Sequence, residues 1–141
     1  MTPLEALQEA LAGEHAALYV YGVLGARVSA SAAPDLATRL SSAYAVHRGR
    51  RDQLTSMVRT AHGSPVAAHT SYEVPTPART AAQITTAARV VEQRCADVYA
   101  DTVGATSRSD RQWAIDALLD AAVRQLSFGA GAERWPGVAE L

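Results

Sequence analysis

The chain has 141 residues, of which 48% are hydrophobic and 19% are charged, and its formal net charge is −1. This composition predicts one globular domain over residues 1–141, and it excludes the basic surface that binding to nucleic acid or to an anionic membrane requires. The single cysteine excludes an intramolecular disulfide, and no signal peptide or membrane span is visible, so we expect a cytoplasmic protein.

Two long helices are predicted in the first half of the chain. The first begins at Thr2-Pro3-Leu4-Glu5, which is a capping box with proline at the first helical position, and its apolar stripe runs to about Val28. The second is predicted from Pro34 to about Ala61, with Gly63 as its stop. Only a few residues separate the two helices, so we expect an antiparallel hairpin.

A connector and two further helices are predicted in the second half. Residues 63–79, GSPVAAHTSYEVPTPAR, contain three prolines and little periodicity, which is typical of a connecting segment. A third helix is predicted over residues 80–103, with Gly104 as its stop. Residues 109–112, SDRQ, read as a second capping box, from which a fourth helix should run to about Phe128.

The length of the connector bears on the fold. Helices of about 25 residues are each about 37 Å long, and a connector of about 17 residues can span up to ~55 Å when extended. The connector can therefore run the whole length of a bundle and leave the second and third helices parallel. The expected fold is all-α: a ferritin-like four-helix bundle with one long crossover between helices 2 and 3, whereas simple up-and-down bundles have none.

Three polar residues interrupt the apolar stripes near the middles of their helices. Glu14 lies on a stripe of the first helix that is otherwise apolar, His47 lies midway between two leucines of the second, and Glu92 lies on the shoulder of the third. Carboxylates and imidazole at one level of a bundle are typical of a carboxylate-bridged metal site. The alternative is a metal-free hydrogen-bonded network, in which Glu14 and His47 pair with each other or with Arg51, Tyr44 or Tyr21.

Other candidate residues have simpler interpretations. Asp116, Asp120 and Arg124 recur at four-residue spacing on the fourth helix, which favours an exposed ladder of ion pairs. His15 points about 100° away from Glu14 and is expected on the flank or surface of the first helix. Cys95 lies on the apolar stripe of the third helix and should pack as a small core residue.

Three segments carry a resemblance to a known family. Residues 11–27 (LAGEHAALYVYGVLGAR), 45–52 (AVHRGRRD) and 135–138 (WPGV) resemble a ferritin-like domain family of unknown function that is common in actinobacteria. The resemblance covers nearly the whole chain, and the Glu-His-Ala-Ala-x-Tyr-x-Tyr-Gly segment is its most specific part. It implies a ferritin-like four-helix bundle.

The resemblance also implies where a metal would be held. Ferritin-like proteins place a glutamate on helices 1 and 3 and a Glu-x-x-His motif on helices 2 and 4. Glu14 and Glu92 match the single positions, and His47 matches the histidine of helix 2. Tyr44 replaces the helix 2 glutamate, and the nearest approach on helix 4, Asp120-Ala-Ala-Val123, lacks the histidine. Three of the six ligands match, so the pattern is incomplete for a two-iron centre.

From these observations we expect a ferritin-like domain with a degenerate metal site, acting as a non-catalytic binding or structural module. The alternative is a metal-dependent oxidoreductase with a carboxylate and histidine iron site in the bundle core. The candidate ligands admit iron or another divalent metal and favour none, and the sequence does not identify the cofactor or a small-molecule partner. The candidate ligands are Glu14, His47, Glu92 and Asp120, with Tyr21, Tyr44, Arg51, Tyr99 and Arg124 as expected polar neighbours.

A homodimer is also expected, because the first and fourth helices carry more apolar residues than one core can cover. The surplus on the first helix includes Val20, Val23 and Leu24, and on the fourth it includes Trp113 and residues 115–126. Large exposed apolar patches usually mark an interface, and two-fold dimers are the commonest solution. Alternatively, the connector and the tail around residues 135–137 fold back over these faces.

Overall fold

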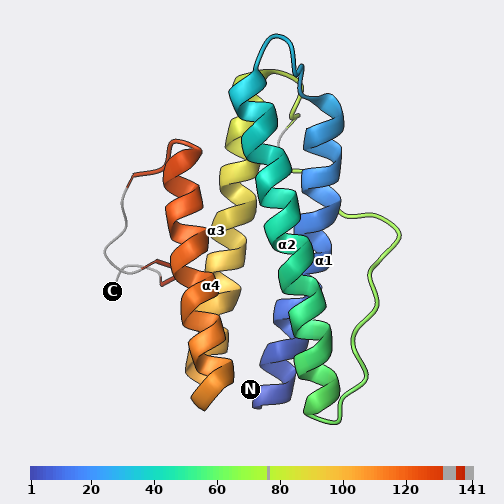
Figure 1. Cartoon of the computed structure of the whole chain (residues 1–141), viewed down its shortest axis with the longest axis vertical. Helices are drawn as coiled ribbons and strands as arrows, with labels where there is room; N and C mark the ends of the chain where they lie inside the picture. The colour runs from blue at the N-terminus through green and yellow to red at the C-terminus, as the bar shows by residue number, and fades with distance from the viewer. Residues whose placement is uncertain (76, 132–135, 139–141) are drawn as a thin grey trace.

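The chain folds into a bundle of four helices, shown by a computed structural model that describes residues 1–75, 77–131 and 136–138 (Figure 1). The helices are α1 (Pro3–Arg27), α2 (Pro34–Thr60), α3 (Ala81–Ala105) and α4 (Arg108–Ser127), and the described residues form no strand. The all-α four-helix class expected from the sequence is therefore confirmed. None of the described helices is both long enough and apolar enough to cross a membrane.

The helix starts are fixed by local hydrogen bonds. At α1, the Thr2 hydroxyl accepts from the Glu5 amide at 3.2 Å, and the Glu5 carboxylate accepts from the Thr2 amide at 2.7 Å, which forms the expected capping box. Thr80 and Gln83 make the same reciprocal pair at the start of α3. These two caps fix the residues at which α1 and α3 begin. The two helices carry the buried Glu14 and Glu92.

Three expected helix boundaries need correction. Gly104 lies inside α3, and α4 begins at Arg108, so Ser109 is already helical and forms no capping box. At the end of α2, the left-handed residue is His62, with φ of 61°, and not Gly63. The Gly63 amide bonds to the Val58 carbonyl at 2.9 Å, and a Cβ at Gly63 would lie 2.7 Å from a methyl of Leu4. Gly63 therefore allows Leu4 to pack closely against the end of α2, and it does not supply the left-handed conformation.

The connector, described over residues 61–75 and 77–80, runs along the length of the bundle beside α1 (Figure 1). It is attached at one end through Gln8, whose side chain bonds to the backbone of Ser64 and Val66, and at the other through Arg27, which donates to the Pro77 carbonyl at 3.2 Å. Because of this crossover α2 and α3 run parallel, as the connector length predicts. The connector covers the outer face of α1.

The packing of the helices places a polar level between apolar ones. α1 packs against α2 and α3, and α4 packs against α3. One apolar cluster contains Leu7, Leu11 and Leu54, and a larger one contains Leu24 and Leu40. On α1 and α2, the buried residues between these two clusters are polar. The candidate site lies at this level.

Candidate functional site

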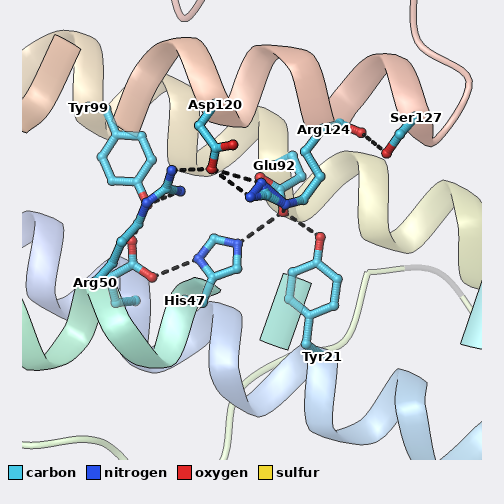
Figure 2. A network of polar contacts seen from close by, with 9 residues as sticks. Tyr21, His47, Arg50, Glu92, Tyr99, Asp120, Arg124 and Ser127 are labelled. Carbon is cyan, nitrogen blue, oxygen red and sulfur yellow. Dashed lines mark hydrogen bonds and ion pairs between the residues drawn. The ribbon is translucent and has the colours of Figure 1, made fainter. Parts of the chain in front are cut away.

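A histidine joins two carboxylates at the centre of the bundle. Glu14 of α1, His47 of α2 and Glu92 of α3 are 1%, 0% and 0% exposed. The Nδ1 atom of His47 lies 2.7 Å from Oε2 of Glu14, and its Nε2 atom lies 2.9 Å from Oε1 of Glu92 (Figure 2). Both ring nitrogens are therefore bound to carboxylates, and the three helices are tied together at one level.

Two buried tyrosines extend this arrangement on either side. The Tyr21 hydroxyl donates to Oε1 of Glu92 at 2.5 Å, and the Tyr99 hydroxyl donates to Oε1 of Glu14. The Tyr21 ring also stacks on His47, with centroids 5.3 Å apart and an interplanar angle of 24°. The result is a continuous hydrogen-bonded chain in the order Tyr21, Glu92, His47, Glu14, Tyr99.

Two arginines complete the network and lead it toward the surface (Figure 2). Arg50 of α2 lies 3.4 Å from the Tyr99 hydroxyl and pairs with Asp120 of α4. Arg124 donates to the same Asp120 oxygen at 2.5 and 2.9 Å, and its Nε lies 3.5 Å from Oε1 of Glu92. The Asp120 side chain is 46% exposed, so it is the point at which the network meets solvent.

The charges of the network balance if His47 is protonated. Burial lowers the pKa of His47, but hydrogen bonds and charges from Glu14 and Glu92 outweigh burial and raise this pKa from 6.5 to about 9. Burial raises the pKa of Glu92, but the hydrogen bond and charge of His47 outweigh it, so that pKa is lowered. His47 is thus an imidazolium at neutral pH. Three positive charges (His47, Arg50, Arg124) then face three negative charges (Glu14, Glu92, Asp120).

The tyrosines remain neutral donors within this network. Burial, followed by the charge of Glu92, raises the pKa of Tyr21 well above 10. Burial, Cys95 and the charge of Glu14 do the same for the pKa of Tyr99. Burial also raises the pKa of the Cys95 thiol well above 9, so this cysteine packs in the core as an unreactive residue, as expected from its stripe.

Comparison with known proteins places the chain in a family. Residues 6–140 match the family described as "Domain of unknown function (DUF4439)". The chain belongs to the DUF4439 family. Its fold is similar to that of a conserved hypothetical protein, rv2844, from Mycobacterium tuberculosis, with a TM-score of 0.82 and 28% sequence identity over 89% of this chain and 93% of the other. A comparison with curated protein sequences gives no match.

The structure of this DUF4439 domain brings most of the predicted site residues together. Glu14, His47 and Glu92 meet directly, and Tyr21, Tyr99, Asp120 and Arg124 surround them. Asp120 and Arg124 do form an i, i+4 pair, but Arg124 faces the core, so the exposed ladder expected on α4 is only partly correct. Asp116 is exposed and accepts from Gln112 at 2.9 Å.

Two predicted neighbours lie outside the network. Tyr44 is 39% exposed, and Arg51 pairs with the adjacent Asp52 at 2.7 Å. The guanidinium inside the network belongs instead to Arg50, one position earlier on α2.

His15 lies 3.0 Å from the Val66 carbonyl of the connector, on the flank of α1 as expected. The Trp135 of the tail lies outside the described residues.

The donor atoms of the DUF4439 site are directed at each other. Within the described part of the chain, no group of three or more His, Cys, Asp or Glu side chains is arranged to hold a metal ion. Oε1 of Glu92 is approached by Tyr21, His47 and Arg124, while Oε2 is buried without a hydrogen-bond partner, as is Nε2 of Gln125. Most of the hydrogen-bonding capacity of the site is therefore used by protein groups.

Proposed function

We propose that this chain is a single-domain ferritin-like protein that acts as a non-catalytic binding or structural module. In this proposal an ion-paired polar network takes the position that a metal centre has in other ferritin-like bundles. The long crossover and the position of Glu14, His47 and Glu92 at one level of α1, α2 and α3 support the ferritin-like assignment. A reducing, cytoplasmic compartment belongs to the same proposal, and the single free cysteine supports it.

The observation that carries the proposal is the environment of His47. A histidine that binds a metal directs the lone pair of one nitrogen at the ion, while its other nitrogen donates to a carboxylate or carbonyl. Here the two nitrogens lie 2.7 and 2.9 Å from carboxylates. Neither nitrogen is directed at an open position, and the residues present supply only part of the two-iron ligand set of ferritin-like proteins.

The arginines supply the positive charge that a metal ion would otherwise provide. Arg124 lies beside Glu92, and Arg50 lies beside Tyr99 and Asp120. A guanidinium is always charged and offers several donors, so it can neutralise carboxylates in a fixed geometry. A buried ion pair often stabilises a core no more than hydrophobic residues of the same volume would, but it can fix how helices align. A structural role for the network follows from this physics.

Metal analysis of tag-free protein tests the proposal. Protein with and without Fe²⁺, Mn²⁺ or Zn²⁺ incubation is desalted, and bound metal is measured by inductively coupled plasma mass spectrometry. We expect metal well below one ion per chain, unchanged by Glu14→Gln. The exposed Glu9→Gln serves as the matched control on the same helix. Stoichiometric metal that Glu14→Gln abolishes and Glu9→Gln retains would overturn the proposal.

A second candidate function, a metal-dependent oxidoreductase with one ion in the core, has one observation in its favour. Oε2 of Glu92 is buried and has no hydrogen-bond partner, so one carboxylate oxygen of the site has a lone pair to spare. The measurement specific to this candidate is oxygen consumption on adding Fe²⁺ anaerobically and then admitting air. Turnover that Glu92→Gln removes would favour it over the structural module.

A further inference from the structure

The two buried tyrosines of the network are hydrogen-bonded alike but have different aromatic neighbours. Tyr21 and Tyr99 each donate to a glutamate that is itself bound to His47. The Tyr21 ring lies 6.4 Å from the buried ring of Phe128. The Tyr99 ring instead meets Trp113 edge to face, with centroids 5.9 Å apart and an interplanar angle of 89°.

Trp113 connects Tyr99 to the surface. It is only partly buried, and it lines an open groove between α2 and α4 together with Gln53, Met57 and Asp110. Its indole N–H donates to Oε1 of Gln53 at 2.8 Å, which fixes the ring at the edge of this groove. A path of directly contacting aromatic rings therefore leads from solvent through Trp113 to Tyr99. On the other side, Tyr21 contacts His47 and Phe128, neither of which is an indole or a phenol.

The hydrogen bond from Tyr99 to Glu14 matters for oxidation chemistry. A phenol becomes a very strong acid when it loses an electron, so a tyrosine is oxidised most readily where a base takes its proton in the same event. Oε1 of Glu14 is such a base, already hydrogen-bonded to the phenolic oxygen. The Arg50 guanidinium already donates to that oxygen at 3.4 Å, and it stays in place to donate after the phenolic proton has left.

We propose that Tyr99 is a one-electron redox site that is reached from the surface through Trp113. A diffusible one-electron oxidant takes an electron from the Trp113 indole at the groove. Tyr99 then returns an electron to the indole, and its phenolic proton moves to Oε1 of Glu14. The products are the reduced oxidant, neutral Trp113, a neutral Tyr99 phenoxyl radical and protonated Glu14, so electrons and protons balance. This inference does not depend on the proposed function, because no step uses a metal.

Tyr21 provides an internal control within the same network. It has the same hydrogen bond to a carboxylate and a comparable degree of burial, since both rings are 1% exposed. It lacks an indole neighbour, and the benzene ring of Phe128 is much harder to oxidise than an indole. If a carboxylate acceptor alone were sufficient, both tyrosines would form radicals. If contact with Trp113 is required, only Tyr99 will.

The test uses photochemical oxidation of metal-free protein. A ruthenium tris-bipyridyl complex, quenched with persulfate in a light flash, supplies the one-electron oxidant. The background protein carries Tyr19→Phe, Tyr44→Phe, Tyr72→Phe and Trp135→Phe, which leaves two tyrosines and one tryptophan of the five and two in the sequence. Phenoxyl formation is followed by transient absorption and by electron paramagnetic resonance of freeze-trapped samples. Circular dichroism melting verifies that each variant is folded.

The outcomes separate the alternatives. We expect a phenoxyl signal in the background protein, its loss in Tyr99→Phe, a several-fold lower yield in Trp113→Phe, and no change in Tyr21→Phe. Because Trp113→Phe leaves Tyr99 and its carboxylate in place, its effect reports the path and not the stability of the core. A signal that survives Tyr99→Phe, an unchanged yield in Trp113→Phe, or no phenoxyl signal in the folded background protein would each overturn the proposal.

Discussion

The Nδ1 atom of His47 lies 2.7 Å from Oε2 of Glu14, in a part of the core where both side chains are fully buried. An ion pair at such a position costs desolvation energy, which the mutual attraction of the two groups offsets only while both are charged. The stability of this domain should therefore depend on the protonation state of one histidine.

The first prediction is a loss of stability at alkaline pH. The carboxylates raise the pKa of His47 from 6.5 to about 9 in the folded chain. Between these values the unfolded chain releases a proton that the folded chain retains, so the free energy of unfolding falls as pH rises. The contribution is complete below pH 6.5, has an upper value of about 3 kcal/mol, and is lost as pH passes through the folded pKa. Urea unfolding measured in steps from pH 6 to pH 10 checks it.

A pair of histidine variants isolates this effect. His47→Gln should flatten the stability profile between pH 6.5 and about 9, because the residue that titrates in this range is gone. The exposed His62→Gln should leave the profile as it is in the wild type. A wild-type profile that is already flat from pH 6.5 to 9 would show that His47 is neutral in the folded chain.

The second prediction concerns the removal of one carboxylate. Glu14→Gln keeps the shape of the side chain but removes one negative charge, so the network carries a net charge of +1. Breaking one partner of a buried pair typically costs ~3–5 kcal/mol, and we expect a loss of this order near pH 6, where His47 is charged. The loss should shrink as pH rises toward the folded pKa of His47, about 9. Urea unfolding of Glu14→Gln against Glu9→Gln at both pH values measures it, and equal losses at the two pH values would contradict it.

Much of this site could be predicted from sequence, because polar residues on an otherwise apolar helix stripe indicate a buried polar site. Glu14 and His47 interrupt leucine stripes, and a charge at a core position needs a partner. Arg50 could not be found in this way. From His47, Arg51 lies about 40° around the helix and Arg50 about 60° on the other side, so both are shoulders of one stripe. The choice between them depends on where α3 and α4 lie, which the α2 sequence does not contain.

The helix ends show the same limitation. Glycine is common just beyond a helix, so Gly104 is expected to end α3, but the helix continues through it to Ala105. Ser107 is the last residue before α4 and makes no side-chain cap bond, and Ser109, which has the capping-box pattern, lies inside the helix. The short turn between α3 and α4 and their mutual packing decide the boundary here, and local pattern does not.

The third prediction concerns Gly137 in the C-terminal tail. Its φ is 73°, and a Cβ at this position would clash with the Ala96 carbonyl oxygen and lie 3.0 Å from the Ala100 methyl of α3. Gly137→Ala should therefore release residues 136–138 from α3. The matched control is Gly129→Ala, which has φ of 85° but open space around it, so it carries only the backbone strain of ~1–2 kcal/mol. The heteronuclear NOE of the Val138 amide should fall in Gly137→Ala and stay unchanged in Gly129→Ala.

The last prediction is self-association through α4. The connector packs along one face of α1, and Gly137 of the tail packs on α3. In contrast, Leu119, Val123 and Leu126 on α4 are 56%, 64% and 46% exposed. Their spacing places them along one stripe of the helix, with the small Ala122 between them, which allows the same stripe of a second copy to approach closely in a two-fold dimer. Light scattering should give twice the chain mass of 14.9 kDa at micromolar concentration. Val123→Glu should reduce the measured mass to that of one chain, while Val66→Glu on the exposed connector should leave the dimer intact. A wild-type protein that is already monomeric would contradict the prediction.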